Sequence, residues 1–253
     1  MTSDSLAAYF GVAPEIAHFI PDLLVDFFEL GSYPETLVQL ARRAGLSSGA
    51  HVVDLGCGKG AVALTMARDI GVRVHGIDAM APFITEARQR AREQGLDPLC
   101  EFTCEDLRNT VERDASYDAA LFVSVGEVLG DNGSTVGAIR RIVRPGGLII
   151  VDDGWTERPC DLPGYATMTS HREVVRQLTS HGDEIVEELV YEAGDIRRMN
   201  ALYQARIEAQ VQRLSAAHPE HADAFRAYLE REKAENRVLD SDVVGASWVL
   251  RRK

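Results

Sequence analysis

Acidic side chains lie at or just after the ends of three successive apolar runs in the first half of the chain. Asp54 lies two residues before the glycine-rich turn 56–60 (GCGKG), Asp78 closes the next apolar run, and Asp106 follows the third with Glu105 beside it. Carboxylates accept hydrogen bonds from hydroxyls and attract cations. A glycine-rich turn that opens a helix lets the backbone approach a ligand closely. The pattern therefore predicts a small-molecule site.

Two kinds of ligand fit this pattern. Gly56, Gly58 and Ala61 satisfy the loose G-x-G-x-x-G/A dinucleotide motif, and Asp78 is placed to accept the ribose hydroxyls of either NAD or S-adenosylmethionine. The carboxylate of Asp54 near the turn would repel a pyrophosphate. It would attract a ligand with a cationic part, such as the ammonium of a methionyl group near a sulfonium.

The elements that carry these residues alternate between strands and helices. The hydrophobic pattern predicts strands over 51–55, 72–77, 99–104, 117–123 and 148–151, with helices over 60–70, 82–94 and 135–143 between them. Such alternation requires crossover connections, so we expect an α/β fold with a mostly parallel sheet covered on both faces. The acids would then meet at the carboxyl edge of the sheet.

The flanking segments are mainly helical. Residues 1–48 are expected to form an N-terminal helical segment, and 49–253 the α/β domain. The latter continues with a helix over 171–180, a strand over 184–191, a helical insertion over 195–236 and a final strand over 243–250. The insertion has one apolar stripe, so it is predicted to be a solvated amphipathic hairpin on the sheet edge, a substrate lid, or both.

The stretch 52–60, Asp78, Asp106, the strand start 117–120 and the run 144–147 (RPGG) together resemble class I S-adenosylmethionine-dependent methyltransferases. The resemblance implies a Rossmann-like seven-stranded sheet of order 3-2-1-4-5-7-6, with the last strand antiparallel. It also implies S-adenosyl-L-methionine as cofactor and direct in-line methyl transfer to a small-molecule acceptor. The motifs leave open whether oxygen, nitrogen, carbon or sulfur accepts the methyl group.

The resemblance also implies a set of cofactor-binding residues. Asp54 would hold the ammonium group, Asp78 the ribose, and Asp106 with Leu107 the adenine, although a shift of one residue would exchange Asp106 for Glu105. The full set comprises Asp54, Gly56, Cys57, Gly58, Asp78, Ala79, Met80, Glu105, Asp106, Leu107, Val123 and Ser124. Within it, Cys57 is expected to pack between two glycines. Lys59, which follows Gly58, is expected to point to solvent.

Residues for the acceptor are predicted from position. Glu127 follows the fourth strand and is the candidate acceptor contact or general base, with a helix cap or a solvated acid as the alternative. Asp152 and Asp153 resemble the acid pair of metal-dependent relatives, but Ser124 stands where those have a third acid, so we expect no metal. Candidate acceptor contacts are Tyr9, His18, Tyr33, Trp155, Tyr165, Met199 and Tyr203, with a structural role as the alternative for His18.

Composition restricts the partners. The chain of 253 residues has a formal net charge of −12, which disfavours nucleic acid and anionic membranes. The strand end 122–125 (FVSV) also lacks the Asn/Asp-Pro-Pro-aromatic motif of base-amino methyltransferases. Without a signal-peptide n-region or zinc-type cysteine spacing, a cytoplasmic protein is expected. A nicotinamide-dependent oxidoreductase and a cofactor-binding protein without turnover are the alternative functions.

Overall fold

A computed structural model describes residues 3–158, 165 and 167–253. The chain divides into two compact units, Met1–Phe28 with Tyr191–Val243, and Glu29–Val190 with Val244–Lys253. We call them the helical unit and the sheet unit. This division differs from the boundary at residue 48 that the sequence suggested, because α3 (Pro34–Arg43) belongs with the sheet and the first 28 residues belong with the insertion.

The sheet unit contains one seven-stranded sheet of order β3-β2-β1-β4-β5-β7-β6, which confirms the predicted order. Strands β1 to β5 pair in parallel, whereas β7 is antiparallel to both β5 and β6. The strands are β1 (His51–Leu55), β2 (Arg73–Asp78), β3 (Cys100–Cys104), β4 (Tyr117–Val123), β5 (Val143–Trp155), β6 (Glu184–Val190) and β7 (Val244–Arg251).

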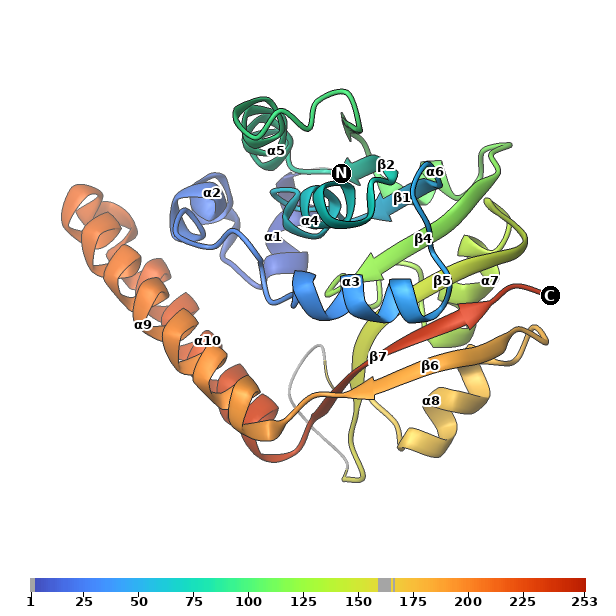
Figure 1. The fold of residues 1–253 in the computed structure, drawn as a ribbon. Helices are drawn as coiled ribbons and strands as arrows, with labels where there is room; N and C mark the ends of the chain where they lie inside the picture. Colours follow the sequence, from blue (N-terminus) through green and yellow to red (C-terminus); the bar gives the residue numbers. More distant parts are fainter. Residues whose placement is uncertain (1–2, 159–164, 166) are drawn as a thin grey trace. The chain divides into compact units, whose positions relative to one another are not determined.

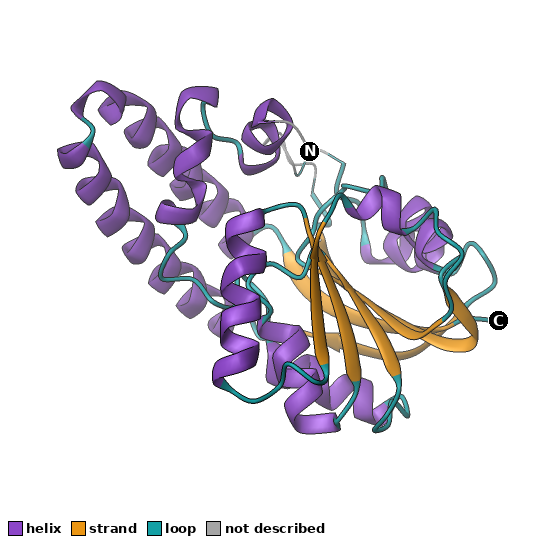
Figure 2. Cartoon of the chain, turned by 90° about the horizontal axis from the view of Figure 1, so that it is seen from above, coloured by secondary structure: helices purple, strands orange, loops and turns teal. Residues whose placement is uncertain are grey.

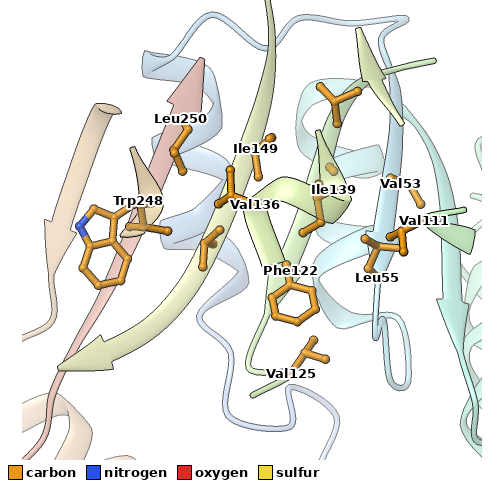
Figure 3. Packing of buried hydrophobic residues seen from close by; sticks show 14 of the residues in the cluster. Val53, Leu55, Val111, Phe122, Val125, Val136, Ile139, Ile149, Trp248 and Leu250 are labelled. Atoms are coloured by element: carbon orange, nitrogen blue, oxygen red, sulfur yellow. The ribbon is translucent and has the colours of Figure 1, made fainter. Parts of the chain in front are cut away.

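Helices cover both faces of this sheet (Figures 1 and 2). The first face is covered by α3, α4 (Ala61–Ile70) and α5 (Ala81–Glu93), and the second by α6 (Leu107–Thr110), α7 (Asn132–Ile139) and α8 (His171–Leu178). Figure 3 shows apolar side chains of the second face, where Val136 and Ile139 of α7 lie in one cluster with Phe122 and Ile149. This core holds the carboxyl ends of the strands in fixed register.

Two elements differ from the sequence predictions by three residues or more at both ends. The helix expected over 135–143 is α7, which begins earlier because the side chain of Asp131 caps it by accepting from the Ser134 N–H at 2.8 Å. The strand expected over 148–151 is the longer β5. Its pairing with β4 shifts register between Tyr117 and Ala119, where β5 carries Pro145 and two glycines.

The helical unit is built from two long helices and short N-terminal elements. Its elements are α1 (Ser3–Phe10), η1 (Pro14–Phe19), α2 (Ile20–Leu23), α9 (Ala193–Ala217), η2 (Pro219–His221) and α10 (Ala222–Ser241). Phe225 of α10 is fully buried and packs edge-on against Phe19, with ring centroids 5.2 Å apart. No described helix is both long enough and apolar enough to span a membrane.

Candidate active site

The glycine-rich turn after β1 and the end of β2 form one hydrogen-bonded unit. Asp78 accepts the Gly58 N–H at 2.9 Å with Oδ2 and the Met80 N–H at 2.8 Å with Oδ1. The backbone N–H groups of Gly56 and Cys57 donate to the Ile77 carbonyl at 2.8 and 2.9 Å. Asp78 therefore holds the glycine turn through the Gly58 N–H while lying at the carboxyl edge of the sheet.

Asp54 is a buried carboxyl group with one unused oxygen. Its residue is 2% exposed, and among the described residues its Oδ2 has no hydrogen-bond partner. Burial, with a smaller contribution from repulsion by Asp78, raises the pKa of Asp54 from 3.8 to about 7, against the opposing effect of a hydrogen bond from the Ala63 backbone. Leaving a buried carboxylate oxygen without a partner is costly, so the site is suited to a ligand that supplies a cation or a donor.

At two glycines of the turn, an added Cβ would meet a neighbouring apolar side chain. A Cβ at Gly56 would lie 2.6 Å from Val125 Cγ2, and one at Gly58 would lie 2.6 Å from Leu30 Cδ1. Cys57 is buried between them and burial raises the pKa of its thiol, which agrees with a packing role.

Lys59 corrects an expectation from the sequence. Its side chain is 1% exposed, its Nζ lies 3.1 Å from Glu86 Oε2, and the ammonium lies 5.6 Å from the centroid of the Phe83 ring. The predicted solvent-facing lysine is therefore wrong, because α5 presents an acid and an aromatic face to the turn. Lys59 ties the glycine turn to α5, and no periodicity in the sequence indicates this contact.

The two acids after β3 form ion pairs with arginines close to them in the sequence. Asp106 caps α6 by accepting the Arg108 N–H at 3.1 Å, and it also pairs with the Arg108 guanidinium at 2.6 Å, which lowers its pKa. Glu105 pairs with Arg113 at 2.6 Å. Leu107 is 7% exposed and lies in the core cluster of the second face. Ala79 and Met80 connect β2 to α5, with Met80 buried.

Asp152 and Asp153 of β5 and Glu127 of the loop after β4 lie in the region of the site that follows β4, where Ser124 Oγ donates to Asp152 Oδ1 at 3.5 Å. Ser124 has a φ of 55°, and Ser247 Oγ donates to Asp152 Oδ2 at 2.5 Å. Glu127 is exposed and accepts a hydrogen bond from Thr167 Oγ1. Desolvation raises the pKa of Asp153, and the charge of Glu127 raises it further. Among the described side chains, no group of three or more His, Cys, Asp or Glu is arranged to hold a metal.

The predicted acceptor contacts fall in both units. In the sheet unit, Trp155 is buried in the core against His171 at a centroid distance of 4.6 Å, whereas Tyr33 and Tyr165 are half-buried.

In the helical unit, Tyr9 is 42% exposed and Met199 is half-buried. Tyr203 packs edge-on against Phe27 at 4.8 Å, and the ring of His18 lies 4.0 Å from that of Phe19. Their contact with an acceptor stays a prediction.

The strand order, the glycine turn after β1 and the acids at the ends of β1 and β2 define a class I S-adenosylmethionine-dependent methyltransferase fold. In agreement, residues 52–147 match the family model of the methyltransferase domain.

Known proteins show the same likeness. Methyltransferase GfsG of Streptomyces halstedii is 30% identical over 142 residues, which are 54% of this chain and 51% of that protein. The ubiquinone biosynthesis O-methyltransferase of Klebsiella pneumoniae is 35% identical over 121 residues, 46% of this chain and 47% of that protein. The chain thus spans about half the length of these relatives.

A solved structure extends the likeness to nearly the whole chain. A methyltransferase from Geobacter sulfurreducens, crystallised with S-adenosyl-L-homocysteine, superimposes with a TM-score of 0.79 at 23% sequence identity, covering 93% of this chain and 98% of that one. At this identity the comparison establishes the fold.

Proposed function

We propose that this protein binds S-adenosyl-L-methionine and transfers its methyl group to a small-molecule acceptor by direct in-line displacement. The observation that carries the proposal is the buried Asp54 carboxyl group, whose Oδ2 has no described partner, beside a turn built from glycines. An α-ammonium group supplies the donors that this oxygen needs. A pyrophosphate would place further negative charge there, which disfavours a nicotinamide-dependent oxidoreductase.

The other residues take roles that follow from their places. Asp78 binds the ribose hydroxyls with the lone pairs that its two backbone donors leave, and Leu107 and Asp106 border the adenine. Val123 and Ser124, at the end of β4, flank the methyl group. The sulfonium supplies an activated methyl carbon, so the protein has only to hold the acceptor in line and exclude water.

Calorimetry with S-adenosylmethionine, S-adenosylhomocysteine and NAD tests the proposal. We expect both adenosyl compounds to bind and NAD to give no heat. Tight binding of NAD without a response to either adenosyl compound would overturn the proposal. Formation of S-adenosylhomocysteine with a panel of hydroxyl, amine and thiol acceptors then distinguishes an enzyme from a cofactor-binding protein without turnover.

We propose Glu127 as the general base for an acceptor that is protonated at neutral pH. It is exposed on the loop after β4 and is held by Thr167. Once an acceptor is found, Glu127→Gln should lower kcat at least about tenfold, within the range of general-base contributions, and leave cofactor affinity nearly unchanged. Glu112→Gln, at an acid 67% exposed, is the matched control. Unchanged turnover in Glu127→Gln would exclude Glu127 as the general base.

A further inference from the structure

The turn between Glu29 and Ser32 contains a residue that does not suit it. The Ser32 N–H donates to the Glu29 carbonyl at 3.0 Å, and the Ser32 hydroxyl donates to the same oxygen at 2.6 Å. The two central residues, Leu30 and Gly31, have φ values of 47° and 91°. Turns with two positive φ angles favour glycine, asparagine or aspartate at both positions. A leucine there is strained, so turn stability does not explain it.

The side chain of Leu30 lies on the glycine turn of the candidate site. Its Cδ1 would be 2.6 Å from a Cβ at Gly58, and the residue is half-buried. Val125 lies equally close to Gly56, where an added Cβ would be 2.6 Å from Val125 Cγ2. Two apolar side chains therefore cover the two glycines that bring the backbone close to a ligand.

A second strained residue lies beside the first. Within the part of the chain that the structure describes, Leu30 and Ser124 are the two non-glycine residues with positive φ. They come from distant parts of the sequence, yet a Cβ at Gly31 would lie 3.8 Å from Ser124 Oγ. Strained backbone concentrates at ligand sites, where the surrounding structure maintains it for function.

We propose that Leu30 is a cofactor-binding residue that clamps the aliphatic part of the methionine half of S-adenosylmethionine on the glycine turn beside Gly58, with which Leu30 is itself in contact. The proposal rests on the proposed function. If Asp54 binds the ammonium group and Asp78 the ribose, the methylene groups between them pass along the glycine turn, where an apolar side chain covers them. Leu30 also excludes water from the ammonium and Asp54, which strengthens their attraction.

Leu30→Asn tests the clamp, because asparagine suits the turn but is polar and shorter. The probes are S-adenosylhomocysteine and 5′-methylthioadenosine, which lacks the amino-acid part. We expect the Kd for S-adenosylhomocysteine to rise about tenfold and the Kd for 5′-methylthioadenosine to stay within about twofold. The melting temperature of the cofactor-free variant should be unchanged or higher.

Three results would overturn the clamp: an unchanged Kd for S-adenosylhomocysteine, an equal loss for both ligands, or a lowered melting temperature. Leu202→Asn is the control. Leu202 is 51% exposed on α9, so this substitution should leave the affinities for both ligands unchanged. If the unmodified protein binds neither S-adenosylmethionine nor S-adenosylhomocysteine, the proposed function itself fails. If it binds them and Leu30→Asn binds equally well, only the clamp fails.

Discussion

Asp54 and Asp78 show how two carboxyl groups at successive strand ends acquire different properties. Asp78 accepts two backbone N–H groups, which oppose the effect of burial on its pKa. Asp54 has one backbone donor, is buried, and is repelled by Asp78, so its pKa rises from 3.8 to about 7. Without ligand, Asp54 is therefore largely protonated below about pH 7. Binding an ammonium group requires its ionised form.

This difference predicts a pH dependence of cofactor binding. The affinity for S-adenosylhomocysteine should rise as the pH increases from about 5.5 to about 7, by up to tenfold per pH unit, because less work is needed to ionise Asp54. Binding at the lower pH should release up to one proton. Calorimetry in buffers of different ionisation enthalpy measures both effects. The Asp54→Asn variant should bind more weakly and lose this pH dependence, and an unaltered dependence in that variant would assign it to another group.

At the scale of elements, the glycine turn is fixed by contacts on both sides. The Asp78 carboxylate accepts from it, and Lys59 joins it to α5 through Glu86 and Phe83. Glu86 also pairs with Arg90 at 2.7 Å, so it keeps a partner when Lys59 is removed.

Lys59→Met should therefore destabilise the protein moderately, by about 1–2 kcal/mol in the free energy of unfolding, because the methionine retains the packing but loses the ion pair. Urea unfolding measures this. Arg68→Met removes a half-exposed surface pair and should change stability by no more than about 0.5 kcal/mol. Equal effects of the two substitutions would show that the buried pair is unimportant.

Helix α10 carries an acid whose pKa differs between the folded and the unfolded state. In α10, burial, together with repulsion by the nearby Glu235, raises the pKa of Glu232 from 4.5 to about 7. The folded state therefore binds this proton more tightly than the unfolded state does, and stability falls as the pH rises from about 4.5 through 7.

Glu232→Gln should raise the melting temperature at pH 8 and have little effect at pH 4.5, where the acid is protonated in the folded state. Thermal unfolding at the two pH values measures this, with Glu230→Gln at an acid 69% exposed as the control. A lower melting temperature of Glu232→Gln at pH 8 would show that the ionised acid stabilises the helix.

At the scale of the whole molecule, the predicted cofactor residues and four of the predicted acceptor contacts belong to different units. Every predicted cofactor residue lies in the sheet unit, whereas Tyr9, His18, Met199 and Tyr203 lie in the helical unit. Hydrogen exchange should therefore slow on addition of S-adenosylhomocysteine at residues 54–60, 76–80 and 104–107, and remain unchanged in α9 and α10. Protection confined to α9 and α10 would contradict the assigned site.

The sheet was predictable because buried parallel strands are continuous apolar runs, and because β1 and β2 end in acids that the resemblance ties to a cofactor. The beginning of α7 was missed, since it depends on the Asp131 cap rather than on periodicity. Lys59 and Leu30 were also missed. Burial of Lys59 requires α5 to lie beside the turn, and the strain at Leu30 exists only in the folded backbone, so neither feature is visible in residue type or spacing.

The thiol of Cys104 offers a way to observe the site directly. Cys104 is exposed at the end of β3, two residues before Asp106, whereas Cys57 and Cys100 are buried. Cys160 lies outside the described residues, so a Cys160→Ser background leaves Cys104 as the exposed thiol beside the buried Cys57 and Cys100. A thiol-reactive fluorophore attached there would sit at the proposed adenine edge, and its emission should change when a nucleoside enters. The strand end thereby becomes an optical reporter for ligand screening before any acceptor is known.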